Sequence, residues 1–172
     1  YDFSSVKHMT TAGEALNPEV YRQFEKATGL QIMEGFGQTE TTLAIANFVG
    51  DTPKPGSMGH PSPLYDVDIV DYDGKSCEVG ETGEIVIRTT EAVPAGLFKG
   101  YYRNEEATRA VFTDDGWFHT GDLASVDKKG RYYIKGRMGT VIIGSSGENI
   151  YPEEIESVIN NIENVTESLV VQ

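Results

Sequence analysis

Cysteine, basic charge and long apolar runs are all scarce in this chain of 172 residues. Cys77 is the only cysteine, which excludes an internal disulfide framework and a cysteine-rich zinc site. It lies in a polar, turn-rich stretch with no histidine nearby, so the sequence does not favour it as a nucleophile. No run of about 18 apolar residues occurs, and we therefore predict no transmembrane segment.

Acidic residues outnumber basic ones by 27 to 14, which gives a formal net charge of −13. Non-specific binding of nucleic acid depends on Lys and Arg side chains that neutralise phosphates, so nucleic acid is not an expected partner. The apolar content of 38% is typical of a globular protein. The N-terminus has no signal-peptide pattern, although the chain begins without Met. We expect a cytoplasmic location.

Changes of pattern along the chain predict three parts. Residues 1–50 look like the end of a large N-terminal α/β domain, and residues 51–135 like an antiparallel β-rich subdomain. Residues 136–172 look like a hinge and the start of a small α+β C-terminal domain. The predicted fold class is therefore an α/β end-piece, a β-rich subdomain and the beginning of a further domain. We expect the chain to be an internal part of a larger enzyme, because such pieces cannot close a sheet of their own.

Periodicity and capping residues predict the individual elements. In the first part, Asn17 and Pro18 suit the start of a helix and Gly29 its end. An alternating stretch at 30–33 predicts the strand that follows. In the β-rich part, strands are predicted at 67–72, 83–88, 117–126 and 132–135, with a short helix at 104–112.

In the last part of the chain, a helix is predicted to begin at Pro152, with acidic residues in its first turn. Ile155, Val158, Ile159 and Ile162 form an apolar stripe at helical spacing, which we expect to face a core. A final strand is predicted at 169–171.

The most informative segment runs from Gly35 to Glu40 and reads GFGQTE. Its glycines let the backbone bend and approach a ligand closely. The Thr39 hydroxyl can bond a phosphate oxygen, and the Glu40 carboxylate is the hard ligand that Mg²⁺ prefers. The segment follows a predicted strand, and open α/β sheets bind ligands at the carboxyl ends of their strands. A plain glycine-rich loop is the alternative interpretation.

Three further motifs contain residues that could bind a ligand. Asp122, in the sequence Thr-Gly-Asp, is predicted to lie at a strand end, where its carboxylate could accept hydrogen bonds from the two hydroxyls of a ribose. The alternative is a turn Asp that caps its own backbone. Arg137 could clamp the same ribose or a phosphate. Gly13, Glu14 and Ala15 form a small turn whose backbone could line an adenine edge. We expect His119 to be a packed or solvated side chain rather than a base.

Three further segments belong to the same ordered series of motifs along the chain: Gly83-Glu84-Ile85, Gly147-Glu148-Asn149-Ile150 and the helix start at Pro152. Together they resemble the adenylate-forming superfamily of acyl-CoA synthetases, peptide-synthetase adenylation domains and luciferases, over essentially the whole chain. The segments at 54–67 and 96–102 look most like medium-chain acyl-CoA synthetases.

The resemblance implies roles for single residues. Thr39 would contact the α-phosphate, and Glu40 would act in catalysis as the Mg²⁺ ligand. Phe36 replaces the Tyr that stacks on adenine, and Asp122 would hold the ribose. The implied cofactor-binding positions are Gly13, Glu14, Ala15, Phe36, Gly37, Asp122, Arg137 and Gly147.

The resemblance also implies an activity. A carboxylic acid would react with ATP, with Mg²⁺ as cofactor, to form an acyl-adenylate, and the acyl group would then pass to CoA. Gly139 stands at the hinge position that is usually Asp or Lys. The family's triphosphate loop and catalytic lysine are expected outside these residues, in the remainder of the parent chain, so this piece alone is expected to be inactive. Two alternatives remain, an adenylation domain that loads a carrier protein and a non-catalytic nucleotide-binding relic.

Overall fold

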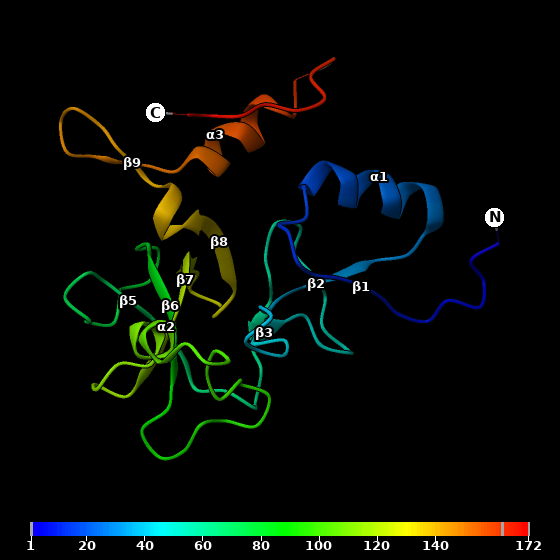
Figure 1. Ribbon diagram of the computed structural model, residues 1–172. Coiled ribbons are helices and arrows are strands. Elements are labelled where there is room, and N and C mark those ends of the chain that lie inside the picture. Colours follow the sequence, from blue (N-terminus) through cyan, green and yellow to red (C-terminus); the bar gives the residue numbers. More distant parts are fainter. Residues whose placement is uncertain (1, 163, 172) are drawn as a thin grey trace.

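The computed structural model describes residues 2–162 and 164–171, and within them it places three sheets (Figure 1). The first sheet has the strand order β1-β2-β3-β4, the second has the order β5-β6-β7-β8, and β9 and β10 form a separate hairpin. This mixture of an α/β unit with antiparallel sheets confirms the predicted fold class. The boundaries that we placed at residues 50 and 135 remain a prediction.

The first sheet contains a βαβ unit. Strand β1 (Met9–Thr11) lies parallel to β2 (Ile32–Phe36), and helix α1 (Pro18–Thr28) connects them. The predicted caps are confirmed: the Asn17 side chain accepts a hydrogen bond from the Glu19 amide at 2.8 Å, and Gly29 ends the helix with a φ of 74°. Strand β3 (Ile45–Ala46) and β4 (His60–Pro61) add antiparallel pairs.

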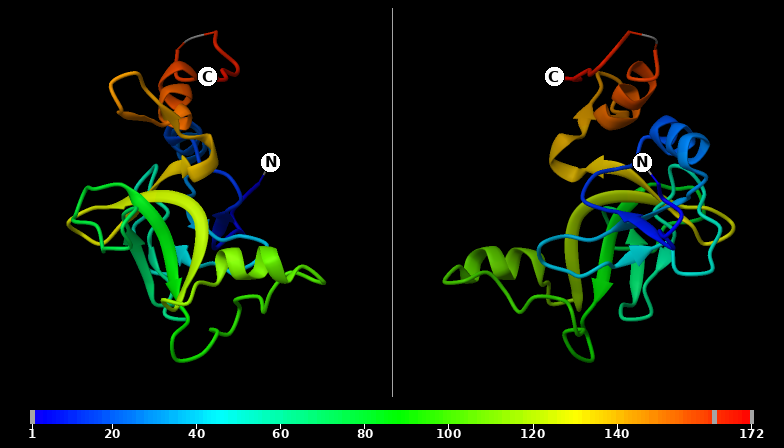
Figure 2. Two further views of the ribbon diagram at one scale, coloured as in Figure 1. Left: turned by 60° about the vertical axis from the view of Figure 1, so that its left-hand side comes forward. Right: turned by 90° about the vertical axis from the view of Figure 1, so that its right-hand side faces the viewer.

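The second sheet is fully antiparallel and follows the predicted strands closely. It consists of β5 (Val67–Val70), β6 (Gly83–Arg88), β7 (Trp117–Val126) and β8 (Tyr132–Arg137). The short helix α2 (Glu105–Val111) lies beside β7 (Figure 2). Strand β6 is buried on both faces, because Ile85, Val86 and Ile87 are all 0% exposed, and Phe118 of β7 is 1% exposed. These apolar side chains form the centre of the core.

Strand β7 carries an irregularity that positions the site. The register shifts between Leu123 and Ala124 on its β8 side, and between Glu84 and Val86 of the neighbouring β6. Gly121 has a φ of 72°, a conformation that glycine adopts at little cost. Asp122 therefore lies in the middle of a bulged strand, whereas we had predicted that it lies at a strand end. The pattern of apolar residues gives no sign of such a bulge.

The two larger sheets are connected by backbone hydrogen bonds and by a shared hydrophobic core. The Met58 amide donates to the Tyr132 carbonyl and the Tyr132 amide donates to the Gly59 carbonyl, both at 2.9 Å. A shared core cluster joins Ile45 of the first sheet to Ile85 of the second. At Gly59 a Cβ would lie 2.2 Å from the Ala46 carbonyl oxygen of β3, so only glycine fits at the position that bridges to Tyr132 of the second sheet.

The last part starts with the 3₁₀ turn η1 (Met138–Thr140) and continues through β9 (Ile142–Ile143) and β10 (Asn149–Ile150) to helix α3 (Pro152–Ile159). Helix α3 stands above β8 and contacts it (Figure 2). No helix in the part of the chain described here is long and apolar enough to cross a membrane.

Two predictions for this last part are wrong. The apolar stripe does not face a core, because Val158 is 69% and Ile162 57% exposed. Helix α3 also ends before Ile162. The predicted strand at 169–171 does not form: the Val170 amide donates instead to a Glu156 carboxylate oxygen at 2.7 Å. A strand needs a partner for its backbone groups, and none lies beside this segment among the described residues.

Candidate functional site

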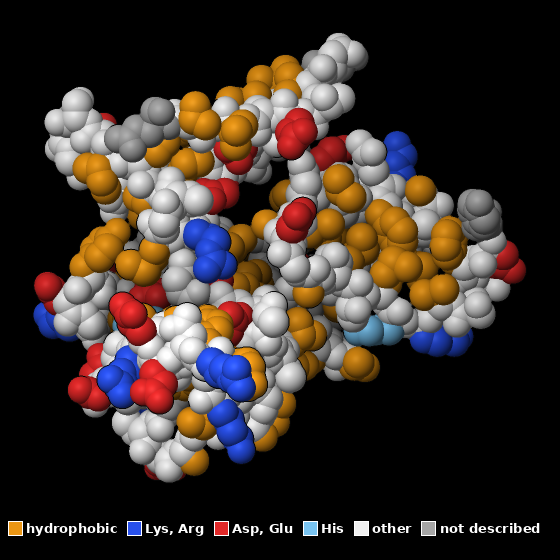
Figure 3. Space-filling view, in the orientation of Figure 1, with side chains coloured by type: hydrophobic (Ala, Val, Ile, Leu, Met, Phe, Trp, Pro, Cys, Tyr) orange, Lys and Arg blue, Asp and Glu red, His pale blue; other side chains and the backbone are white. Residues whose placement is uncertain are grey.

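One large cleft gathers most of the residues that the sequence pointed to. It has a volume of about 1620 Å³ and is bounded by the start of α1, the end of β2, strands β7 and β8, and helix α3. In the space-filling view, the hollow lies between the α3 part and the α1 part of the molecule (Figure 3). The predicted residues that line it are Gly13, Glu14, Ala15, Phe36, Gly37, Thr39, Glu40, Asp122 and Arg137.

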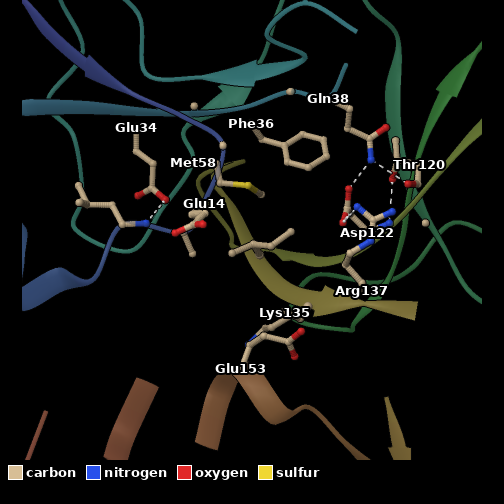
Figure 4. Close-up of a pocket in the computed structure, with 18 of the residues that line it drawn as sticks. Glu14, Glu34, Phe36, Gln38, Met58, Thr120, Asp122, Lys135, Arg137 and Glu153 are labelled. Carbon is tan, nitrogen blue, oxygen red and sulfur yellow. Dashed lines mark hydrogen bonds and ion pairs between the residues drawn. The ribbon is translucent and has the colours of Figure 1, made fainter. Parts of the chain in front are cut away.

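Asp122 lies at the centre of a polar network in this cleft (Figure 4). It is only 5% exposed, and one of its oxygens, Oδ1, lies 3.1 Å from Arg137 Nη1. The Gln38 side-chain amide donates to the other oxygen, Oδ2, and to the Thr120 carbonyl at 2.8 Å. Burial raises the pKa of Asp122, and the Arg137 charge opposes this rise. The carboxylate is therefore held in place by two neighbours, Arg137 and Gln38, before any ligand arrives.

The Glu84 side chain of β6 stabilises the bulge in β7 through polar contacts. One oxygen of Glu84 accepts the Gly121 amide at 2.8 Å, and the other lies 2.7 Å from His119 Nδ1. The Thr120 hydroxyl donates to the Ile85 carbonyl at 2.7 Å and accepts the Asp122 amide at 3.1 Å. These contacts pair the backbone groups that the bulge leaves without ladder partners, and they direct Asp122 into the cleft. His119 is half-buried against Glu84, as expected for a packed side chain.

Thr39 and Glu40 lie in the turn after β2. The Gln38 amide donates to the Thr41 hydroxyl at 2.9 Å, which closes this turn. At Gly37 a Cβ would lie 2.7 Å from the Thr42 carbonyl oxygen, so the tight turn requires glycine. The Glu40 carboxylate accepts a hydrogen bond from the Tyr101 hydroxyl at 2.8 Å. Burial, followed by this bond, raises the pKa of Tyr101, which keeps the hydroxyl protonated and able to donate.

The opposite side of the cleft contains apolar side chains. The Phe36 ring projects into it beside Met58 (Figure 4). Buried Glu34 holds the adjoining turn in place, because its Oε1 accepts the Leu16 amide at 2.9 Å. Burial raises the pKa of Glu34, and this hydrogen bond opposes the rise. The bond connects the turn at residues 13–16 to strand β2 and so brings Gly13 to Ala15 to the same cleft.

Gly147 is the one predicted site residue that the structure does not bring to the cleft. It lies in the turn between β9 and β10, where its φ is 86°. Helix α3 lines the cleft instead, through Glu153 and its neighbours, and the Lys135 ammonium pairs with Glu154 at 2.6 Å. In this orientation of the last part, the hairpin and the cleft are separate.

The cleft also suits a magnesium ion. Among the described residues there is no group of three or more His, Cys, Asp or Glu side chains that could hold a metal by itself. Magnesium usually takes only one or two protein carboxylates, and substrate phosphates and waters complete its shell. Glu40 fits this pattern: it lines the cleft, and its Oε2 accepts no hydrogen bond within residues 2–162 and 164–171.

Sequence reasoning missed four side chains that order this site: Glu34, Gln38, Glu84 and Tyr101. Gln38 and Glu84 stand inside motifs that the sequence analysis had singled out for their neighbours. Glu34 had no signal beyond its place before such a motif, and Tyr101 lies in the segment 96–102, which had been assigned no role at the site. The partners of both residues lie far away in the sequence.

The sequence pattern of the family described as AMP-binding enzyme matches residues 1–102. The chain belongs to this family. Among curated proteins, the chain is 42% identical over 171 residues to the mitochondrial acyl-coenzyme A synthetase ACSM3 of Mus musculus. It is also 42% identical over 171 residues to the mitochondrial acyl-coenzyme A synthetase ACSM5 of Homo sapiens. Each match covers 99% of this chain and 29% of the relative. The resemblance predicted from the motifs is therefore confirmed.

Solved structures give the same result. The ATP-bound MatB of Rhodopseudomonas palustris is similar with a TM-score of 0.86 at 33% identity, over 95% of this chain and 32% of that one. The AMP complex of the O-succinylbenzoate coenzyme A synthetase MenE of Bacillus subtilis has a TM-score of 0.81 at 31% identity. That match covers 95% of this chain and 33% of MenE.

These comparisons correct one expectation. The acyl-coenzyme A synthetases named above are mitochondrial proteins, which contradicts the cytoplasmic location that we expected. The composition of the chain carries little information about its compartment. The chain spans about 29% of the length of these curated relatives.

Proposed function

We propose that the chain is part of an ATP-dependent acyl-CoA synthetase, closest to the medium-chain type. Such an enzyme activates a carboxylic acid as an acyl-adenylate and transfers the acyl group to CoA. The observation that carries the proposal is the convergence of Thr39, Glu40, Asp122 and Arg137 around one cleft. These residues lie up to about a hundred positions apart in the sequence, yet they meet where one AMP moiety could contact them all.

Each side chain has a role suited to its surroundings. Asp122 would accept hydrogen bonds from the ribose hydroxyls, and Arg137, which is well exposed, would contact the ribose or a phosphate. The apolar side with Phe36 would receive the adenine, next to the turn of Gly13 to Ala15. Thr39 would donate a hydrogen bond to the α-phosphate.

Glu40 would hold Mg²⁺, which supplies positive charge that stabilises the phosphate oxygens. The protein itself orients the nucleotide and the carboxylate substrate toward each other. Attack of the carboxylate oxygen on the α-phosphorus forms the acyl-adenylate and releases pyrophosphate. Attack of the CoA thiol on the acyl carbon then releases AMP.

The last part of the chain would serve the second step. We propose that residues after Arg137 form a hinge about which a small domain turns, with Gly139 absorbing the rotation. At Gly139 a Cβ would meet no heavy atom within 4 Å, so this position is not needed for close packing. Rotation would bring the hairpin that contains Gly147 toward the cleft when CoA reacts.

The full-length parent protein tests this function. A panel of carboxylic acids should support exchange of labelled pyrophosphate into ATP, and thioester should form with CoA. Thioester formation on a carrier protein but not on CoA would favour the adenylation-domain alternative. Binding of AMP without exchange for any acid would favour the non-catalytic relic, and absence of AMP binding would refute the nucleotide site altogether.

A further inference from the structure

The carboxylate of Glu40 has an asymmetric environment. Its Oε1 accepts a hydrogen bond from the Tyr101 hydroxyl at 2.8 Å, and its Oε2 accepts none from the part of the chain that the structure describes. Both residues line the cleft. Tyr101 comes from a segment that the motif-based interpretation assigned no role in the nucleotide site.

The segment that carries Tyr101 is hydrogen-bonded through its backbone to the turn that contains Glu40. The Phe98 amide donates to the Glu40 carbonyl at 2.7 Å, and the Thr42 amide donates to the Gly96 carbonyl at 2.9 Å. Thr41 and Leu97 form an antiparallel bridge between these two contacts. The same segment therefore binds both the backbone and the side chain of Glu40.

Tyr101 is itself held firmly. Its ring meets Phe98 edge to face at a centroid distance of 4.8 Å. Phe98 in turn packs against Phe118, whose ring is 5.8 Å away and almost fully buried in the second sheet. The Tyr101 amide donates to the Thr108 hydroxyl of α2 at 2.9 Å. Because its ring and its backbone are fixed to different elements, the Tyr101 hydroxyl has a defined position.

We propose that Tyr101 is a positioning residue for metal binding. Its hydroxyl occupies Oε1 of Glu40, which fixes the side-chain rotamer and leaves Oε2 as the oxygen for the divalent cation. A ligand whose orientation is set in advance loses less conformational entropy when the metal binds. This inference rests on the proposed function, specifically on Glu40 as a metal ligand.

The test compares Tyr101→Phe with the neighbouring Tyr102→Phe in the full-length parent protein. Tyr101→Phe removes only the hydroxyl and keeps the ring packed on Phe98. Tyr102 is 85% exposed and does not line the cleft, so its variant is a matched control. The readout is the affinity for Mn²⁺, a paramagnetic substitute for Mg²⁺, in the complex with a non-hydrolysable ATP analogue, followed by electron paramagnetic resonance.

We expect Tyr101→Phe to weaken Mn²⁺ binding about three- to tenfold, as for loss of one hydrogen bond to a ligand. The affinity for the ATP analogue without metal should be unchanged, and Tyr102→Phe should behave like the wild type. Loss of metal-free nucleotide affinity together with thermal stability would show a merely structural role and overturn the proposal.

The Glu40→Gln variant separates this inference from the function beneath it. If Glu40→Gln weakens Mn²⁺ binding and Tyr101→Phe does not, the positioning role is wrong while the metal site stands. If neither variant changes Mn²⁺ binding, Glu40 is not the metal ligand, and both assignments fail. In the double variant, Tyr101→Phe should add nothing to Glu40→Gln, and an additive effect would contradict the coupling.

Discussion

Replacing Asp122 by Ala in the full-length parent protein probes the assignment on which the nucleotide site depends. The carboxylate is buried and already oriented by Arg137 and Gln38, so it needs no rearrangement to accept the ribose hydroxyls. A hydrogen bond to a charged group contributes about 1.5–3 kcal/mol. Its loss should weaken AMP binding by about 10- to 150-fold.

The fold should survive this change. Arg137 is 61% exposed at its side chain, so water can solvate its charge after Asp122 is removed. The cost to stability should therefore stay well below the roughly 3–5 kcal/mol that is typical of breaking a fully buried ion pair. Asp66→Ala is the matched control, because it also removes a carboxylate paired with an arginine, Arg88, but outside the cleft.

Calorimetric titration with AMP and with 2′,3′-dideoxy-AMP makes the test specific to the ribose. Wild-type protein and Asp66→Ala should prefer AMP, whereas Asp122→Ala should bind the two nucleotides with nearly equal affinity. An Asp122→Ala protein that still discriminates against the dideoxy nucleotide as strongly as the wild type would refute the ribose assignment. An unchanged dissociation constant for AMP would refute it as well.

Three further predictions concern the same protein. Glu40→Gln should raise the Mg²⁺ concentration needed for half-maximal binding of ATP, and an identical metal titration would contradict the metal role. Burial raises the pKa of Asp122, so the folded state holds this proton more tightly than the unfolded state. The free energy of unfolding measured in urea should therefore decrease as pH rises from the ordinary aspartate pKa of about 3.9 toward the raised value. Asp122→Ala should make this dependence of stability on pH less steep, and an unchanged dependence would contradict the raised pKa of Asp122. Gly139→Pro should reduce thioester formation more than pyrophosphate exchange, with Gly139→Ala as control, and equal loss in both steps would count against the hinge.

Local signals in the sequence predicted most of the elements. The cap at Asn17 and the left-handed Gly29 fix the ends of α1 within the chain itself, and the short apolar runs at β6 and β7 predicted strands whose apolar side chains the structure buries. The sequence failed where the outcome depends on a partner elsewhere. The segment at 169–171 has strand-like composition, but no neighbouring strand pairs with it among the described residues.

The candidate site divides along the same line. Residues with a function visible in their own chemistry, such as Glu40 and Asp122, could be proposed from the sequence. Glu84 and Tyr101 could not, because their contribution is a contact with a residue 37 or 61 positions away. A hydrogen bond of this kind is specified by the register of β6 on β7 and by the path of the loop after Gly96, neither of which leaves a periodic trace in the sequence.

The charge of the cleft gives a physical reason why the proposed chemistry needs a divalent cation. Its only lysine and arginine side chains among the described lining residues are Lys135 and Arg137, and each is already paired with a carboxylate, as is His119. The acidic lining residues are Glu14, Glu34, Glu40, Glu84, Asp122, Glu153, Glu154 and Glu156. A triphosphate that approached this lining alone would meet charge of its own sign. In the proposed site, a cation held by Glu40 would reverse this local repulsion, so the same carboxylate that repels free nucleotide would help to bind the metal complex.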